Sequence, residues 1–337
     1  MKKVLLFLIS LLVGTALFIW ILNFVGWQEI KNAFLVFTGW HGLTILGLTI
    51  LMALVGNWRW REILRGGGIT VSFLGLFRPY LAGFSVMFLA PVLLWGGEIL
   101  RTYILKERNF IPWSRGMASV IIDRILEWTA NLVVIFFGIV FFLLTIGFPP
   151  IKLGIIFGGV FLFFVAGVTF FYFKSFKKES MAKAFLKIFN QKSDNKPLEI
   201  EKEFFNFFKP KKRAMWKAFL LSFFRTTIML LRTWLLITFL GKEISVLPAL
   251  SVLGFSYLAA IIPIPTALGS HEVIQTFAFN SLDLGSSLAT VFTMIIRGAE
   301  LMLAFCGVII LFRLGLSLLK NTFFKKFEKF DIKNQGL

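Results

Sequence analysis

The chain has 337 residues, of which 58% are hydrophobic and 16% charged, and its mean hydropathy is +0.83. This composition excludes a water-soluble enzyme, although the length would allow two or three soluble domains. The net charge of +19 invites a nucleic-acid function, but no polar, base-facing surface is visible, so we expect no nucleic-acid partner. With one cysteine and two histidines, the chain cannot form an internal disulfide, and we expect neither a metal nor a cofactor.

Six apolar runs predict helices that cross the membrane, a distance of ~30 Å that takes ~20 apolar residues. The first run is longer than the ~7–15 apolar residues of a signal peptide and has no small-residue cleavage pattern, so it predicts a retained span. The second run closes with Trp58 and Trp60 beside two arginines, which is typical of an aromatic and basic interface anchor. The predicted spans are 4–28, 43–58, 128–151, 153–173, 216–241 and 286–312.

Two further apolar stretches, 79–105 and 246–282, are each interrupted near the middle by proline and glycine. Each stretch is either a kinked span or a re-entrant hairpin that returns to its own side. Broken backbone at membrane depth is tolerated only where it is buried in protein or lines a wet cavity, which points to a transport path. The predicted turn residues are Pro91, Gly96 and Gly97 in the first stretch, and Pro263, Pro265 and Gly269 in the second.

The positive-inside rule separates these alternatives, because a kinked span and a hairpin place the following loops on opposite sides. If both stretches are hairpins, 28 lysines and arginines lie inside and three outside. If both cross, the count becomes 14 inside and 17 outside, which violates the rule. We therefore predict two hairpins, one entering from each face of the inner (cytoplasmic) membrane, with both termini cytoplasmic.

The resulting fold class is an all-α, polytopic membrane protein with six spanning helices and two re-entrant hairpins. We expect one membrane domain over 1–315, a basic cytoplasmic loop over 174–213 and a basic tail over 316–337. In the loop, Met181, Phe185, Ile188 and Phe189 share one helical face, which predicts a helix lying on anionic lipids of the inner leaflet. The tail repeats this pattern, and the sequence leaves homo-oligomer formation open.

The two broken stretches begin an internal repeat, over about 72–147 and 246–313. In each copy a glutamate follows a proline by seven residues, and an Arg-x-x-Glu motif begins 26 or 25 residues after that glutamate. Three predicted spans lie between the two broken stretches, and this odd number makes the second copy inverted, as in many transporters. The repeated residues are Pro91, Glu98, Arg124 and Glu127 in the first copy, and Pro265, Glu272, Arg297 and Glu300 in the second.

The repeated arginines are expected near the middle of the bilayer. Arg124 lies about nine residues into a helix that starts near Gly116, and Arg297 about eleven into one that starts near Ser286, which places them ~13–16 Å from opposite faces. A charge facing lipid at that depth costs ~2.5–3.5 kcal/mol, so both should face inward or be paired. Two interpretations stay open: a substrate site, or a clamp in which each arginine pairs with the glutamate of its own motif.

Several other polar residues complete the candidate site. Arg232, with Arg225 seven residues earlier on the same helical face, has no local carboxylate and would leave a net positive lining. Glu98 and Glu272 fall in the first turn of each return helix, where they either cap the helix or carry protons. The candidate substrate-binding residues are Arg101, Asp123, Arg124, Arg232, Arg297, Glu98, Glu127, Glu272 and Glu300.

The motif Pro91-Val-Leu-Leu-Trp-Gly-Gly-Glu98-Ile-Leu-Arg101, with Asp123-Arg124-Ile-Leu-Glu127 and the later Gly269-Ser-His-Glu272, resembles the lysylphosphatidylglycerol synthase transmembrane-region family over nearly the whole chain. These flippase-like domains form the membrane half of the bacterial multiple peptide resistance factor, which is implicated in moving aminoacylated phospholipid between leaflets. Since only a basic tail follows Phe312, we expect neither the aminoacyl-transferase domain nor synthesis of lysyl lipid.

Three functions remain in competition at this point. The resemblance favours a lipid translocase, not an enzyme, whose partner is a membrane phospholipid or a polyprenyl-phosphate lipid. Arginine suits that role because its planar fork donates paired hydrogen bonds to phosphate. The alternatives are a membrane component or enzyme of a polyprenyl-phosphate or glycolipid pathway, with Glu98 or Glu272 as general base, and a small-solute secondary transporter.

Overall fold

The computed structural model describes residues 39–89, 96–147, separate positions within 155–173, and residues 195–208, 213–260 and 269–334. Within these ranges every regular element is a helix, and four helices are long and apolar enough to cross a membrane. The predicted all-α, polytopic membrane fold is therefore confirmed. The four helices are α3 (Gly39–Gly66), α6 (Trp113–Ile146), α10 (Arg213–Phe239) and α13 (Ser286–Asn334), of which the last spans the membrane with Ser286–Arg313.

The two broken stretches form helical hairpins, as predicted. The first pairs α4 (Phe73–Leu89) with α5 (Gly96–Asn109), and the second pairs α11 (Val246–Ala260) with α12 (Ser270–Ser281); the two arms of each hairpin pack against each other. The longest arm has 17 residues, or ~26 Å at ~1.5 Å per residue, so no arm crosses the hydrocarbon core alone. Pro91, Pro263 and Pro265 lie outside the described residues.

Glycine allows the arms of the first hairpin to approach closely. A Cβ atom added to Gly97 would collide with the backbone carbonyl oxygen of Gly83, and one added to Gly83 would meet the side chain of Arg101 at 2.6 Å. Both positions therefore require the smallest residue, because a methyl group has no space between the two backbones.

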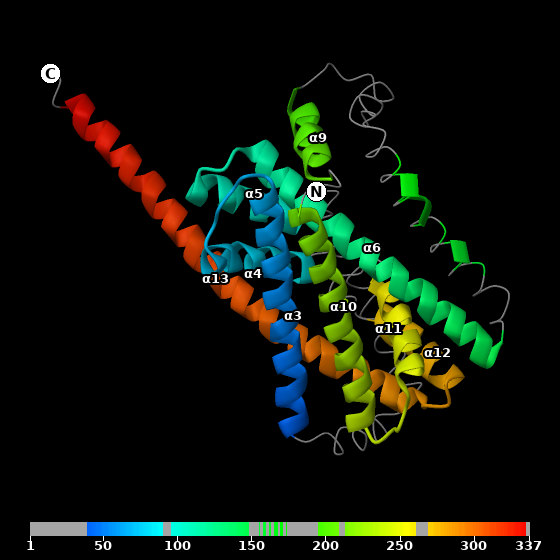
Figure 1. The fold of residues 1–337 in the computed structure, drawn as a ribbon. Coiled ribbons are helices and arrows are strands. Elements are labelled where there is room, and N and C mark those ends of the chain that lie inside the picture. The colour runs from blue at the N-terminus through cyan, green and yellow to red at the C-terminus, as the bar shows by residue number, and fades with distance from the viewer. Residues whose placement is uncertain are drawn as a thin grey trace.

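Residues that the hairpin topology assigns to one side of the membrane do lie at one end of the molecule. Gly67 after α3, Arg115 in α6 and Glu203 in α9 (Asn195–Phe207) line one small hollow, where Arg115 Nε donates to Glu203 Oε1 at 3.1 Å. Figure 1 shows the same end of the molecule carrying α9 and the C-terminal part of α13. If the first stretch crossed the membrane, Gly67 and Arg115 would lie at opposite ends.

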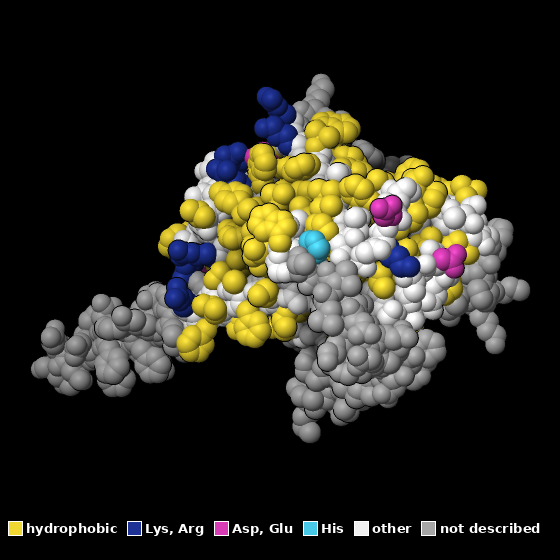
Figure 2. All heavy atoms as spheres, turned by 90° about the horizontal axis from the view of Figure 1, so that it is seen from below, with side chains coloured by type: hydrophobic (Ala, Val, Ile, Leu, Met, Phe, Trp, Pro, Cys, Tyr) yellow, Lys and Arg dark blue, Asp and Glu magenta, His cyan; other side chains and the backbone are white. Residues whose placement is uncertain are grey.

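Figure 2 views the molecule from the opposite end. Hydrophobic side chains cover much of the described surface in this view, and a few lysines or arginines are seen. The identity of the cytoplasmic face stays a prediction.

Antiparallel packing of α3 against α10 relates the two repeats. Arg59 Nη1 donates to Ser222 Oγ at 3.4 Å near one end, and Arg232 Nη1 donates to Thr49 Oγ1 at 3.0 Å near the other. The two bonds are equivalent to each other, because Arg59 corresponds to Arg232 and Thr49 to Ser222 at an offset of 173 residues, which is also the offset from Arg124 to Arg297. α3 and α10 thus belong to the repeat, and their opposite directions make it inverted (Figure 1).

The hairpins follow the same symmetry, because each hairpin packs against the long helices of both repeats. The first arm of each hairpin packs against the long helix of the other repeat, α4 on α13 and α11 on α6. The second arm packs against the long helix of its own repeat, α5 on α6 and α12 on α13. The two halves are therefore interlocked, and side chains from both meet in the centre.

Two helices extend beyond the apolar runs that predicted them. α3 continues past Trp58 to Gly66, and α6 begins at Trp113, close to the helix start expected near Gly116, and ends before Gly147. Trp60 is not an interface anchor: its side chain is fully buried and its Nε1 donates to Ser119 Oγ at 3.0 Å. Hydropathy places the end of α3 too early and the start of α6 too late, because both helices continue past charges that are buried within the protein.

Two other expectations concern residues whose side chains are not described. The predicted amphipathic segment of Met181 and Phe189 lies outside the described residues. In the tail, the backbone of α13 is helical as far as Asn334, but its side chains after Arg313 are likewise outside the description.

Candidate anion-binding cavity between the repeats

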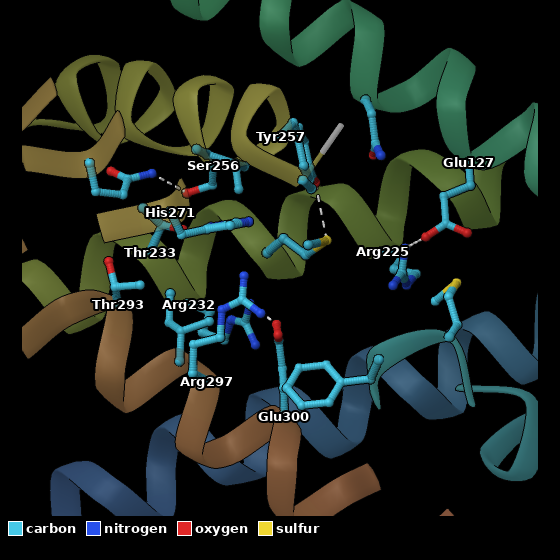
Figure 3. A pocket seen from close by; sticks show the side chains of 18 of the residues that line it. Glu127, Arg225, Arg232, Thr233, Ser256, Tyr257, His271, Thr293, Arg297 and Glu300 are labelled. Carbon is cyan, nitrogen blue, oxygen red and sulfur yellow. Dashed lines mark hydrogen bonds and ion pairs between the residues drawn. The ribbon is translucent and has the colours of Figure 1, made fainter. Parts of the chain in front are cut away.

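A cavity of about 290 Å³ lies where the two repeats meet. It is lined by α4 and α6 from the first repeat and by α10, α11, α12 and α13 from the second (Figure 3). Six described charged residues line it: Arg124, Arg225, Arg232, Arg297, Glu127 and Glu300.

The first group of charges, here called the Glu127 cluster, comprises Glu127, Arg124 and Arg225. Glu127 Oε1 accepts from Arg225 Nη1 at 2.6 Å, and its Oε2 accepts from Arg124 Nη1 at 3.0 Å. Arg59, which lies behind the cluster, donates to the same Oε2 at 3.2 Å. The Arg124–Glu127 pair predicted from the Arg-x-x-Glu motif is therefore present, but Glu127 also gathers arginines from two other helices.

The second group, the Glu300 cluster, comprises Glu300, Arg232 and Arg297. Arg232 Nη2 donates to Glu300 Oε1 at 3.2 Å. In Figure 3 the side chains of Arg232 and Arg297 lie together beside Glu300, on the other side of the cavity from Arg225 and Glu127. The guanidinium carbon of Arg297 lies 5.8 Å from the centre of the Phe88 ring, a cation–π contact across the repeats.

The described lining carries more positive than negative charge. Its four arginines face two glutamates, so the charged residues sum to plus two. The side chains of Arg124, Arg225 and Glu127 are 15–16% exposed and that of Glu300 is 23% exposed, so the clusters open onto the cavity. Uncompensated cations in a site of low dielectric are costly, and an anion in the cavity would stabilise them.

The rest of the lining contains both polar and apolar side chains. Gln275 Nε2 donates to Val252 O at 3.1 Å and to Ser256 Oγ at 2.6 Å. Phe84, Phe88, Phe292 and Ile296 are among the apolar side chains of the lining. An amphiphilic ligand, with a polar group attached to a hydrocarbon chain, matches such a lining.

Two of the candidate residues are buried beside the cavity and do not line it. Asp123 accepts from Arg59 Nε at 2.6 Å and from both terminal nitrogens of Arg101 at 3.1 Å. Arg101 lies 4.0 Å above the Trp60 ring and 4.8 Å from that of Tyr80. This arrangement connects α3, α5 and α6 without contact to the cavity.

The two hairpin glutamates are placed differently. Glu98, buried in the first turn of α5, accepts from Nε of Arg124 and so ties the hairpin to α6. Glu272, in the first turn of α12, accepts from the backbone N–H of Gly269 at 2.7 Å, which is the geometry of a helix cap. Gly269 has φ of +82°, a conformation that favours glycine. Of the two roles considered for Glu272, capping the helix or carrying protons, this geometry matches capping.

Two arginines were not among the candidate residues: Arg225, which lines the cavity, and Arg59, which is buried beside it. The sequence placed Arg225 on the same helical face as Arg232, and it placed Arg59 at the membrane interface. The repeat contains a signal for Arg59, because it precedes Glu127 by the same 68 residues that separate Arg232 from Glu300. Arg225 has no such signal, since Met52 stands at the equivalent position of the first repeat.

Within the described ranges, no group of three histidine, cysteine or acidic side chains could hold a metal ion. The chemistry available at the cavity is therefore that of guanidinium, carboxylate and amide groups. These groups bind and orient an anion through charge and hydrogen bonds.

Comparison with known proteins agrees with the resemblance seen in the motifs. A membrane protein of the UPF0104 group from Methanocaldococcus jannaschii is 25% identical over 312 residues, which cover 88% of this chain and 90% of the relative. Another from Pyrococcus horikoshii is 28% identical over 274 residues, covering 74% of this chain and 81% of the relative. No solved structure matches the chain significantly. Residues 7–307 match the family described as the lysylphosphatidylglycerol synthase transmembrane region, and the chain belongs to this family.

Proposed function

We propose that this protein is a translocase that moves an anionic or phosphate-bearing lipid between the leaflets of the cytoplasmic membrane. The observation that carries the proposal is the cavity between two inverted repeats, lined by four arginines and two glutamates. Inverted repeats with broken helices are a frequent transporter plan, in which the site lies near the bilayer midplane.

The proposed mechanism assigns different roles to the charged and the apolar side chains of the lining. The guanidinium groups of Arg232 and Arg297 hold the phosphate by paired, charge-assisted hydrogen bonds. Phe84, Phe88 and Phe292 contact the first atoms of the hydrocarbon chain, which otherwise stays in the bilayer. Rocking of the two halves around the cavity would expose the headgroup to each face in turn.

The test is a lipid-flipping assay in proteoliposomes. Fluorescent phosphatidylglycerol is quenched from outside with dithionite, and the rate of its appearance in the outer leaflet is followed. We expect Arg297→Ala to lower this rate at least tenfold, Arg297→Lys to retain part of it, and the control Lys217→Gln, at an exposed position of α10, to leave it unchanged. Rates that stay equal in all variants would remove the headgroup role, and a covalently altered lipid in the mass spectrum would instead support an enzyme.

A further inference from the structure

The two charged clusters of the cavity are equivalent in composition. The Glu127 cluster and the Glu300 cluster each contribute two arginines and one glutamate to the cavity lining, so each adds one positive charge in excess to that lining. Glu98, which lies behind the lining, also pairs with Arg124. The excess is thus divided between two places, because the clusters lie on different sides of the cavity (Figure 3). A ligand with a single small anionic group could neutralise one cluster only.

Each cluster also presents a donor that has no partner. The Nε atoms of Arg225 and Arg232 are buried and make no hydrogen bond to any described residue. By contrast, Nη1 of Arg225 donates to Glu127, and the two terminal nitrogens of Arg232 donate to Thr49 and Glu300. The Arg232 side chain is only 3% exposed. A buried N–H without an acceptor is unfavourable, and such groups are rare in folded proteins. We therefore expect a ligand to supply an acceptor for each of these two donors.

The spacing of these donors sets the size of the ligand. Arg225 and Arg232 are seven residues apart on α10, which is two turns, so their side chains leave the same face of the helix ~10 Å apart. Both residues line the cavity. A diphosphate group, extended by a hydrogen bond of ~2.9 Å at each end, is of the length that joins two such donors.

We propose that the headgroup carried by this cavity contains two linked anionic groups, as in a lipid diphosphate, with one group bound to each cluster. This inference rests on the proposed function and narrows its substrate class. The Nε and terminal nitrogens of Arg225 bind the outer anionic group in the Glu127 cluster, and those of Arg232 bind the other group in the Glu300 cluster. Glu127 and Glu300 hold the two arginines in position for this contact.

The test compares two ligands that share one hydrocarbon chain. Farnesyl monophosphate and farnesyl diphosphate are titrated into the purified full chain in neutral detergent, and binding is measured by calorimetry. We expect the diphosphate to bind at least tenfold more tightly. Arg225→Gln and Arg232→Gln should each lower the affinity for the diphosphate at least tenfold, whereas the affinity for the monophosphate should fall in only one of these variants. Lys217→Gln on the same helix is the matched control.

A second pair of variants covers a failure of the glutamine variants to fold. Arg225→Lys and Arg232→Lys keep the charge opposite Glu127 and Glu300 but lack the Nε donor, so they should fold and still lose most of the preference for the diphosphate. Equal affinities of the wild-type chain for the two ligands would overturn the inference. So would a tenfold loss for both ligands in both glutamine variants. If phosphatidylglycerol is still flipped in either case, the translocase proposal survives without the diphosphate specificity.

Discussion

At the scale of single residues, the two repeats differ in how firmly their arginines are held. In the first repeat, Asp123 binds Arg59 and Arg101 together, and all three side chains are at most 3% exposed. Ile296 of the second repeat stands at the position that corresponds to Asp123, and Gln275 stands at the position that corresponds to Arg101. A buried carboxylate that balances two guanidinium groups therefore stabilises one half of the molecule and has no equivalent in the other.

Replacing this carboxylate should be costly for stability. Asp123→Asn keeps the shape of the side chain but leaves Arg59 and Arg101 with less compensating charge, and loss of one partner of a buried ion pair typically costs ~3–5 kcal/mol. We expect a corresponding drop in the free energy of unfolding, measured by denaturant titration in mixed micelles. The control is Glu203→Gln, which removes an exposed pair with Arg115 and should change stability by less than ~1 kcal/mol. Equal effects of the two substitutions would contradict this account.

At the scale of elements, the hairpins are joined to the long helices through glycines. On one side of the molecule, a Cβ atom at Gly138 of α6 would lie 2.8 Å from the carbonyl oxygen of Leu250 in α11, and Ser251 Oγ donates to Gly138 O at 2.8 Å. On the other side, a Cβ atom at Gly307 of α13 would collide with the carbonyl oxygen of Leu81 in α4. Each interface exchanged between the repeats therefore requires close backbone contact.

Larger side chains at these two glycines should separate the helices. We expect Gly138→Leu and Gly307→Leu each to destabilise the protein by at least ~1–3 kcal/mol through overpacking, with a lower midpoint of thermal unfolding. Gly298→Ala, in the same helix as Gly307 but with open space around its Cβ position, should be neutral or stabilise the protein by up to ~1 kcal/mol. If Gly138→Leu and the Gly298→Ala control unfolded at the same temperature, the prediction of overpacking would be contradicted.

At the scale of the whole molecule, the hairpin topology places three loops at defined ends. Thr70, between α3 and α4, and Glu107, near the end of α5, are exposed at the end that carries α9, whereas Asp283 is exposed after α12 at the other end. In a variant without the single native cysteine, Cys306→Ser, we expect Thr70→Cys and Glu107→Cys to react with a membrane-impermeant maleimide from the same side. Asp283→Cys should react from the opposite side only. Labelling of residues 70 and 107 from different sides would show that the first hairpin crosses the membrane.

The sequence was sufficient for the features that depend on local pattern or on the distribution of charge. It predicted the hairpins, the inverted repeat and the inward position of Arg124 and Arg297, since depth in a helix and the positive-inside rule need no knowledge of packing. It could not assign Arg225 to the site, because its partner Glu127 lies 98 residues away and Met52 stands at the equivalent position of the first repeat, whereas the spacing of the repeat would have indicated Arg59. Span prediction from hydropathy also cannot show that each hairpin packs against the long helix of the other repeat, because this depends on long-range packing.

The most direct measurement of the central claim is the position of the headgroup itself. The full chain would be imaged by electron cryomicroscopy in nanodiscs that contain an anionic lipid, at a resolution that locates phosphate density. The account predicts phosphate between the repeats, within hydrogen-bond distance of Arg232 and Arg297, and its absence in the Arg232→Gln/Arg297→Gln variant. A cavity without lipid, with phosphate density confined to the basic end near Arg115, would contradict it.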